Sequence, residues 1–275
     1  MNTRRPMLEV KALAKSYGEG GDAVRAIDNL TFTVDEGEFV CIVGPSGCGK
    51  TTMLKCLSGL LPSTSGTAAL DGEVIDGPPD TLALVFQEYT RSLLPWMSVL
   101  QNVMLPLKAK KLAGDESLRL AQESLEAVGL TDFTDAYPWQ LSGGMQQRVA
   151  IARALAYQPT ILLMDEPFAS VDAQTRAELE DLMLKVREQF QVTIVLVTHD
   201  IDEAVYLADR VVVLSQRPTF VREIVAVDLP AGRNQVTTKE LPEFAHLRGH
   251  VARLIMGSPG DSAVGSATTT TQGVA

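Results

Sequence analysis

The segment from Gly44 to Thr51, which reads Gly-Pro-Ser-Gly-Cys-Gly-Lys-Thr, has residue types at a spacing that binds phosphate groups. It fits the pattern G-x-x-x-x-G-K-[ST] without a mismatch. Its glycines let the backbone wrap closely around phosphate oxygens, with successive N–H groups pointing inward. We expect Lys50 to reach the β- and γ-phosphates of ATP and the Thr51 hydroxyl to bind Mg²⁺. The expected contact residues are Gly44, Pro45, Ser46, Gly47, Cys48, Gly49, Lys50, Thr51 and Thr52.

A glycine-rich turn between a strand and a helix is the purely structural explanation of this segment. The complete motif follows an expected strand, Phe39–Val43, and precedes an expected helix, and that context favours the phosphate site. Cys48 raises a separate hypothesis, because a helix N-terminus can lower the pKa of a thiol. The motif accepts almost any residue at this position, so a redox role for Cys48 is the less favoured interpretation.

Two adjacent carboxylates, Asp165 and Glu166, follow the apolar run Ile161–Met164. In an open α/β sheet, ligands bind at the carboxyl ends of the strands. Asp165 is then placed to hold Mg²⁺, directly or through water, and Glu166 to act as general base toward an attacking water. A strand that simply runs out into solvent would look the same. The phosphate-binding segment elsewhere in the chain favours the catalytic interpretation.

The elements that must position these groups alternate between short β-branched runs and helical patterns, which is typical of an α/β fold with a largely parallel sheet. Most of the runs are continuously apolar, as in a sheet covered on both faces. The expected strands are Leu30–Val34, Phe39–Val43, Leu82–Phe86, Ile161–Met164, Thr193–Val197 and Arg210–Leu214. The expected helices are Lys50–Gly59, Val99–Leu107, Glu116–Val128, Gly143–Ala156, Ala173–Phe190, Ile201–Leu207 and Leu241–Met256.

The overall composition sets limits on partners. Lys and Arg number 24 against 34 Asp and Glu, so the formal net charge is −10. This acidity argues against direct binding to nucleic acid and against a polybasic grip on anionic lipid. No stretch approaches the roughly 18 apolar residues of a membrane span. The three cysteines have no metal-ligand spacing and are expected to be reduced cytosolic thiols.

Further segments lie in the order and spacing of a known family, and with them the chain closely resembles the nucleotide-binding subunit of ABC transporters over residues 7–225. They are Leu141-Ser-Gly-Gly-Met-Gln-Gln-Arg148, Ala169-Ser-Val-Asp172, Thr198-His199-Asp200, Gln87 and Tyr17. The resemblance implies a P-loop NTPase core of the RecA type, with an antiparallel β-subdomain and an inserted α-helical subdomain that carries the signature segment.

In that family two subunits form a head-to-tail dimer, with ATP between the phosphate loop of one and the signature segment of the other. The resemblance therefore implies that Ser142, Gly143 and Gly144 contact the γ-phosphate bound to the partner. A Ser-Gly-Gly helix N-terminus is in any case suited to an anion. Its structural alternative is a plain N-cap, which two glycines would weaken.

The remaining roles are also implied by the resemblance. His199 would orient the water and contact the γ-phosphate, Gln87 would contact Mg²⁺ and the water, and Asp172 would line the dimer interface. Tyr17, expected in a short loop, would stack on adenine. Taken alone, each of these residues has a structural explanation: a histidine or glutamine ending a strand, or an aromatic anchor in a loop.

The chain departs from the family pattern at two positions. Met145 stands where the signature usually ends in Gln, and Ala169-Ser-Val-Asp172 replaces the usual Ser-Ala-Leu-Asp. The contacts that Met145 and Ala169 would make are therefore open. Ser142, the glycines and Asp172 are retained, so we expect a competent ATPase.

Two longer segments, Gln87–Leu107 and Thr238–Arg248, are similar to the nitrate, sulfonate and taurine importers of the family. This implies an ATP-hydrolysing subunit that powers import through a separate transmembrane permease, paired with a second ATP-binding subunit and served indirectly by a solute-binding protein. It also implies a peripheral position at the cytoplasmic face of the inner membrane. The apolar residues Leu93–Met97 would belong to the groove that receives a short permease helix, or else pack inside the helical insertion.

The expected organisation has an ATPase domain over 7–230, with a helical subdomain at about 87–158. A helical extension follows at 231–256, and the tail 257–275 has too few large apolar residues to order itself. Two other functions stay open. They are a soluble ABC-type ATPase and a regulatory nucleotide-binding subunit that is not coupled to transport.

Overall fold

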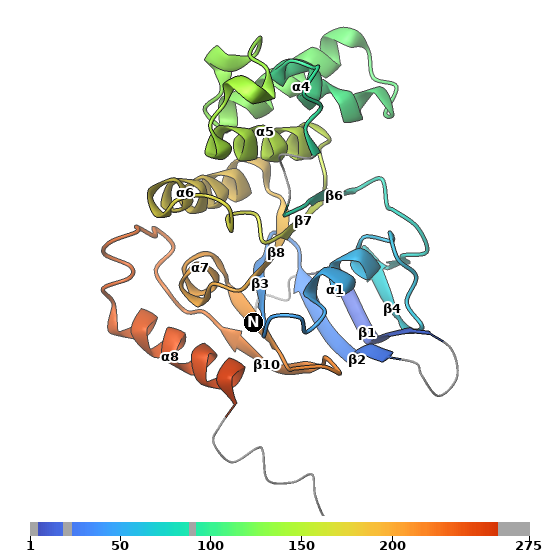
Figure 1. Cartoon of the computed structure of the whole chain (residues 1–275), viewed down its shortest axis with the longest axis vertical. Helices are drawn as coiled ribbons and strands as arrows, with labels where there is room; N and C mark the ends of the chain where they lie inside the picture. Colours follow the sequence, from blue (N-terminus) through green and yellow to red (C-terminus); the bar gives the residue numbers. More distant parts are fainter. Residues whose placement is uncertain (1–4, 19–23, 88–91, 258–275) are drawn as a thin grey trace, which may run out of the picture.

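The computed structural model describes residues 5–18, 24–87 and 92–257, so the expected disordered tail lies outside it apart from Gly257. Within these residues one sheet has six strands in the order β10-β9-β3-β8-β7-β6 (Figure 1). Its strands are β3 (Phe39–Val43), β6 (Leu82–Val85), β7 (Ile161–Asp165), β8 (Thr193–Thr198), β9 (Arg210–Leu214) and β10 (Val221–Ala226). All neighbours pair in parallel except β9 and β10.

The second sheet is antiparallel and has the order β2-β1-β4-β5 within the described residues. It contains β1 (Pro6–Tyr17), β2 (Val24–Asp35), β4 (Ser65–Leu70) and β5 (Glu73–Val74). Figure 1 shows it beside helix α1 (Lys50–Leu57), on one side of the central sheet. The expected antiparallel subdomain is therefore present.

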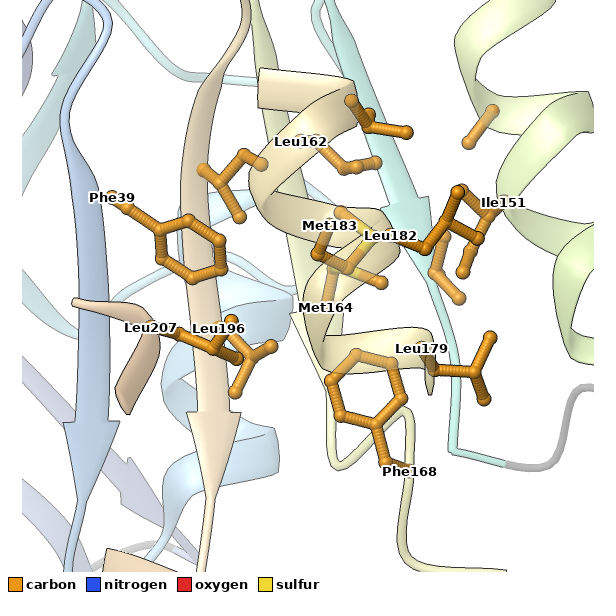
Figure 2. Packing of buried hydrophobic residues seen from close by; sticks show 14 of the residues in the cluster. Phe39, Ile151, Leu162, Met164, Phe168, Leu179, Leu182, Met183, Leu196 and Leu207 are labelled. Carbon is orange, nitrogen blue, oxygen red and sulfur yellow. The ribbon is translucent and has the colours of Figure 1, made fainter. Parts of the chain in front are cut away.

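The central strands are buried on both faces, as their continuous apolar runs predicted. Every residue of β3 is buried, and its side chains alternate between two hydrophobic clusters. Phe39, Cys41 and Val43 join the cluster that contains the helices, whereas Val40 and Ile42 join the cluster on the side of α1 and the second sheet. Figure 2 shows Phe39 in the first cluster, together with core residues of β7, β8 and helix α6 (Ala173–Phe190). The period of two along the strand thus divides the core into two layers.

The helical insertion lies between β6 and β7, and its described residues form no strand. It contains α3 (Val99–Met104), the 3₁₀ turns η2 (Leu105–Lys108), η3 (Thr131–Phe133) and η4 (Pro138–Gln140), α4 (Gly114–Ala127) and α5 (Gly143–Ala156). Helices α4 and α5 lie at the top of the molecule in Figure 1, away from α1. The remaining helices, α7 (Ile201–Leu207) and α8 (Pro242–Met256), pack against each other and against the central sheet.

Several expected boundaries were wrong, and each has a local cause. The expected helix Val99–Leu107 changes to a 3₁₀ turn after Met104, because Pro106 has no N–H to bond and its ring would crowd the preceding turn. The expected helix Lys50–Gly59 ends at Leu57, and Gly59 takes the positive φ of 71° that stops it.

Four strands, β1, β4, β5 and β10, were not predicted, and Leu30–Val34 is only the end of the longer β2. β1 reads poorly because its pairing register with β2 shifts repeatedly, and Ala12 has a φ of +48°. These irregularities interrupt the alternation of apolar and polar residues on which strand prediction depends. Tyr17 was expected in a short loop, but it is the last residue of β1.

No helix in the described ranges has both the length and the hydropathy that crossing a membrane would require.

Helix α7 contributes a buried carboxyl group that makes stability depend on pH. Glu203 is 4% exposed, and burial raises its pKa to about 8, with the carboxylates of Glu180 and Asp200 acting in the same direction. The folded pKa is thus above the ordinary value of 4.5. Between these values the folded chain holds a proton that the unfolded chain has lost, so this group makes stability fall as pH rises.

We therefore expect Glu203→Gln to remove a negative slope from the plot of unfolding free energy against pH. The slope should change by up to about 1.4 kcal/mol per pH unit between pH 5 and 8, because one proton is involved. Urea unfolding at a series of pH values measures it. Glu126→Gln, which changes an exposed carboxylate, serves as control and should leave the slope as in the wild type. Identical slopes in the wild type and Glu203→Gln would contradict the shift.

Candidate active site

The predicted site residues follow four neighbouring parallel strands, in the sheet order β3-β8-β7-β6. The phosphate loop follows β3, His199 follows β8, Asp165 ends β7, and Gln87 comes shortly after β6. Parallel strands that pair side by side end at the same edge of the sheet. This edge is where open α/β sheets bind ligands.

The phosphate loop has the backbone conformation that its glycines predicted. Gly47 and Gly49 have φ values of 74° and 113°, which side chains rarely allow, and α1 begins directly after Gly49. Lys50 is 7% exposed, and its ammonium donates to the carbonyl oxygens of Gly44 at 2.9 Å and Pro45 at 3.2 Å. The lysine is therefore held over its own loop, where a phosphate group would meet both its charge and the N-terminus of α1.

Cys48 does not have the environment of a reactive thiol. It is 2% exposed, and burial raises its pKa although the charge of Lys50 acts in the opposite direction. A raised pKa keeps the thiol protonated, and the thiolate is the reactive form. The redox hypothesis for Cys48 was therefore wrong.

Thr51 and Asp165 meet beside the phosphate loop. Burial raises the pKa of Asp165, while a hydrogen bond with Thr51 and the charge of Lys50 lower it. A carboxylate and a hydroxyl are the hard oxygen ligands that Mg²⁺ takes, and Mg²⁺ usually keeps waters and substrate phosphates as its other ligands. No group of three or more His, Cys, Asp and Glu side chains gathers around a possible metal position in the part of the chain described. The donor set thus fits a magnesium ion that arrives with a nucleotide.

Two residues that follow different strands, Gln87 and His199, converge on one oxygen atom, Oε2 of Glu166. Gln87 Nε2 donates to it at 3.3 Å, and Nδ1 of His199 lies 3.0 Å from it. Glu166 has a φ of +44°, an unfavourable value for a residue with a side chain, and its N–H donates to the Val197 carbonyl at 2.8 Å. The bond to the neighbouring strand β8 holds this strained backbone, which directs the carboxylate toward the loops after β6 and β8.

Tyr17 lies close to the phosphate loop, although β1 belongs to the other sheet. Its hydroxyl is 3.4 Å from Oγ1 of Thr52 on α1, and the residue is 45% exposed. The ammonium of Lys15 lies 5.5 Å from the ring centroid. An exposed ring beside the phosphate loop is available for stacking on a base.

The signature residues lie at the start of α5, and Figure 1 shows that helix well separated from α1. Ser142 does cap the helix, since its hydroxyl accepts from the N–H of Met145 at 3.3 Å. Ser142 and Gly143 are nevertheless exposed, so the N-terminus of α5 is open to a further ligand. The structure therefore does not bring the signature residues to the phosphate loop of their own chain.

Gly144 is required by close packing against α6. A Cβ added to it would lie 2.3 Å from Cγ2 of Thr175, which is too close for two carbon atoms. Met145, which departs from the family pattern, is half-buried and packs against the helical side of the core. The other departing residue, Ala169, is exposed.

Asp172 begins α6 as its N-cap. Its carboxylate accepts from the N–H groups of Gln174 and Thr175 at 3.1 and 3.0 Å, and from the Thr175 hydroxyl at 2.7 Å. The hydrogen bonds from Thr175 lower the pKa of Asp172. The side chain is thus ionised and fixed in one direction at an exposed loop.

A cavity of about 210 Å³ lies between β6 and α5, with Phe86 and Ser92 in its lining. Arg153 of α5 closes one wall, and its guanidinium donates to the Ser92 carbonyl at 2.6 Å and the Ser92 hydroxyl at 2.8 Å. The lining residues are Ala83, Leu84, Val85, Phe86, Ser92, Pro106, Ala150, Arg153, Ala154 and Tyr157. Most of these lining residues were not predicted as site residues, because they come from separate segments of the chain and no short sequence motif connects them.

The predicted groove residues Leu93–Met97 are split by the structure. Leu93 is 2% exposed and belongs to the core, whereas Trp96 is 69% exposed. None of the five lines the cavity. The alternative, packing inside the insertion, is correct for Leu93.

Comparison with known proteins supplies the family. A family model described as "ABC transporter" matches residues 27–169. The nitrate import ATP-binding protein NrtD of Synechocystis is 41% identical over 91% of this chain and 95% of its own length. The aliphatic sulfonates import ATP-binding protein SsuB of Bacillus thuringiensis is 39% identical over 87% of this chain and 96% of its own length.

A solved structure gives the same result in three dimensions. It is described as the dimeric, post-hydrolysis state of the ATP-binding cassette MJ0796 bound to ADP and Pi. Its TM-score with this chain is 0.70 at 36% identity, over 80% of this chain and 99% of the other. With a complete phosphate loop, paired acidic residues at the end of β7 and relatives matched over nearly their whole length, the chain belongs to the ABC transporter family, as an ATP-binding subunit that hydrolyses ATP.

Proposed function

We propose that this ATPase powers the import of an anionic solute, of the nitrate, sulfonate or taurine type, through a separate membrane permease. The observation that carries the ATPase chemistry is the convergence of Gln87 and His199 on the Glu166 carboxylate, beside the phosphate loop. The import of anions is supported by the relatives, whose names specify import of nitrate and of aliphatic sulfonates.

The proposed chemistry assigns each group one task. Lys50 and the N–H groups of the phosphate loop bind the β- and γ-phosphates, and Thr51 and Asp165 would hold Mg²⁺, which neutralises phosphate charge when bound. Glu166 accepts a proton from the attacking water. His199 and Gln87 contact the same oxygen of Glu166, so they orient its carboxylate toward the attacking water.

A second copy of the chain would complete each site. Ser142 and Gly143 are exposed at the N-terminus of α5, which lies apart from the phosphate loop of the same chain. A head-to-tail dimer would bring this helix N-terminus to the γ-phosphate held by the partner and place Asp172 between the two subunits. The solved structure of MJ0796 is described as dimeric, which supports a dimer of this chain. ATP binding then favours the closed dimer, and hydrolysis removes the phosphate that joins the halves.

We assign the cavity between β6 and α5 to the permease. Its lining includes Phe86, the neighbour of Gln87, and residues of α5 in the helical subdomain, so a permease segment seated there would move when either part moves. The subunit would thereby be held at the cytoplasmic face of the inner membrane. In this assignment residues 7–230 form the ATPase domain, 87–158 its helical subdomain and 231–256 an extension, and Tyr17 stacks on adenine.

Glu166→Gln should lower the turnover of ATP by about 10² to 10⁴-fold, because the amide cannot accept the proton of the attacking water. ATP binding should persist, since Lys50 and the phosphate loop are unchanged. Phosphate release and the binding of a fluorescent ATP analogue measure the two properties. Glu178→Gln, on the exposed surface of α6, is the control and should retain wild-type turnover. Unchanged turnover in Glu166→Gln would contradict the assigned role of Glu166.

Phe86→Ala should release the subunit from membranes, because Phe86 is an exposed aromatic in the wall of the cavity. Tagged variants expressed in the source organism can be separated into washed membranes and a soluble fraction. Phe220→Ala is a matched control, with an exposed fraction of 46% against 42% for Phe86. Full membrane retention of Phe86→Ala would contradict the docking site, and absence of the wild type from membranes would favour the soluble ATPase.

A further inference from the structure

The first turn of α6 contacts three loops that the function uses separately. Thr175 packs against Gly144 of the signature segment and donates its hydroxyl to Asp172. Arg176, the next residue, contacts the loop before α6 and the loop after β8 that carries His199. In the proposed dimer Ser142 and Gly143, which precede Gly144, and Asp172 face the partner, whereas His199 faces the ATP bound to its own chain. This turn therefore lies between groups that serve different ATP sites.

Arg176 makes the connection between the two loops with one side chain. Its Nη1 lies 3.2 Å from Oδ2 of Asp200, and its Nη2 donates to the carbonyl of Val171 at 3.4 Å. Val171 directly precedes Asp172, and Asp200 directly follows His199. The planar guanidinium fixes the relative direction of these two contacts, which a lysine ammonium would not do.

Asp200 transmits its position to the backbone on both sides of His199. Its Oδ1 accepts from the N–H groups of Asp202 and Glu203 and so caps α7. Its own N–H donates to Oγ1 of Thr198 at 3.0 Å, and this hydroxyl donates to Oε2 of Glu203 at 3.2 Å. His199 is therefore held between two residues of one hydrogen-bonded network, although its own side chain is more than half exposed.

We propose that Arg176 is a positioning residue that couples the Val171–Asp172 loop to His199, so that the contact of Asp172 with a second copy sets His199 for hydrolysis. The proposal rests on the proposed ATPase dimer. The Arg176 and Asp200 side chains are each 32% exposed, and such partly exposed ion pairs contribute little to stability. The main effect of this pair is then to fix the orientation of the loop before α6 relative to the loop after β8.

The test compares Arg176→Gln with a matched control on the same helix. Arg187 pairs with Asp209 at 2.6 Å, with 21% and 32% of the two side chains exposed, and its guanidinium bonds Gly37 and Asp209 rather than the loops of Asp172 and His199. Arg176→Gln should lower kcat by about tenfold to a hundredfold, as a small displacement of a reacting group does, and leave the KM for ATP within about twofold. Arg187→Gln should keep wild-type kcat and KM. Phosphate release gives the kinetic constants, and thermal unfolding confirms that each variant is folded.

Arg176→Lys separates charge from geometry. It keeps the attraction to Asp200 but cannot hold both acceptors in the same plane, so its kcat should lie between those of the wild type and Arg176→Gln. If Arg176→Gln does not fold, Asp200→Asn replaces it, because Asn is nearly as good a helix cap while the ion pair is lost. A wild-type kcat in Arg176→Gln, or in Asp200→Asn where that variant replaces it, would overturn the proposal.

A double-variant comparison tests the coupling itself. If Arg176 transmits the contact of Asp172, then adding Asp172→Asn to Arg176→Gln should give a kcat close to that of the slower single variant. Two independent contributions would multiply their reductions instead, and that outcome would overturn the coupling. A wild-type chain that does not hydrolyse ATP would contradict the proposed function. ATP hydrolysis by Arg176→Gln at the wild-type rate would contradict only this inference.

Discussion

Four parallel strands, β3, β8, β7 and β6, end at one edge of the central sheet, and the groups assigned to hydrolysis follow them. The constraint is the parallel pairing, because it brings together chain segments that are separated by more than a hundred residues. Glu166 shows how closely the loops depend on it. Its N–H bonds to the carbonyl of Val197 on β8, and its carboxylate meets Gln87 and His199 from the two neighbouring strands.

The burial of charge at this edge explains how an acidic chain captures an anionic nucleotide. The net charge of −10 is spread over the whole molecule, whereas Lys50 and the N-terminus of α1 act at one place. Asp165 is buried beside them with a raised pKa, so a cation brought with ATP would lower the free energy of its charged form. The local arrangement of charges and N–H groups therefore decides whether the site binds an anion or a cation, and the net charge of the chain does not.

Much of the fold could be predicted because the central strands are buried on both faces and read as apolar runs. β3, β9, α5, α6 and α7 have the predicted bounds. The strands that were missed lie at exposed edges or, like β1, contain register shifts, and there the hydrophobic pattern is weak. Site residues in contiguous motifs were found, whereas Arg153 and Tyr157 of the groove were not, since they share a surface but no sequence pattern.

The sequence by itself determined which residues could bind phosphate and accept a proton, because the phosphate loop and the Asp165-Glu166 pair are local patterns with one chemistry. Only the tertiary structure decided how they act together. Gln87 and His199 meet on one oxygen of Glu166, and Arg176 lies between the loops of Asp172 and His199, because strand pairing and the packing of α6 bring distant segments into contact. Distances of that kind depend on the whole chain, so no short stretch of sequence could specify them.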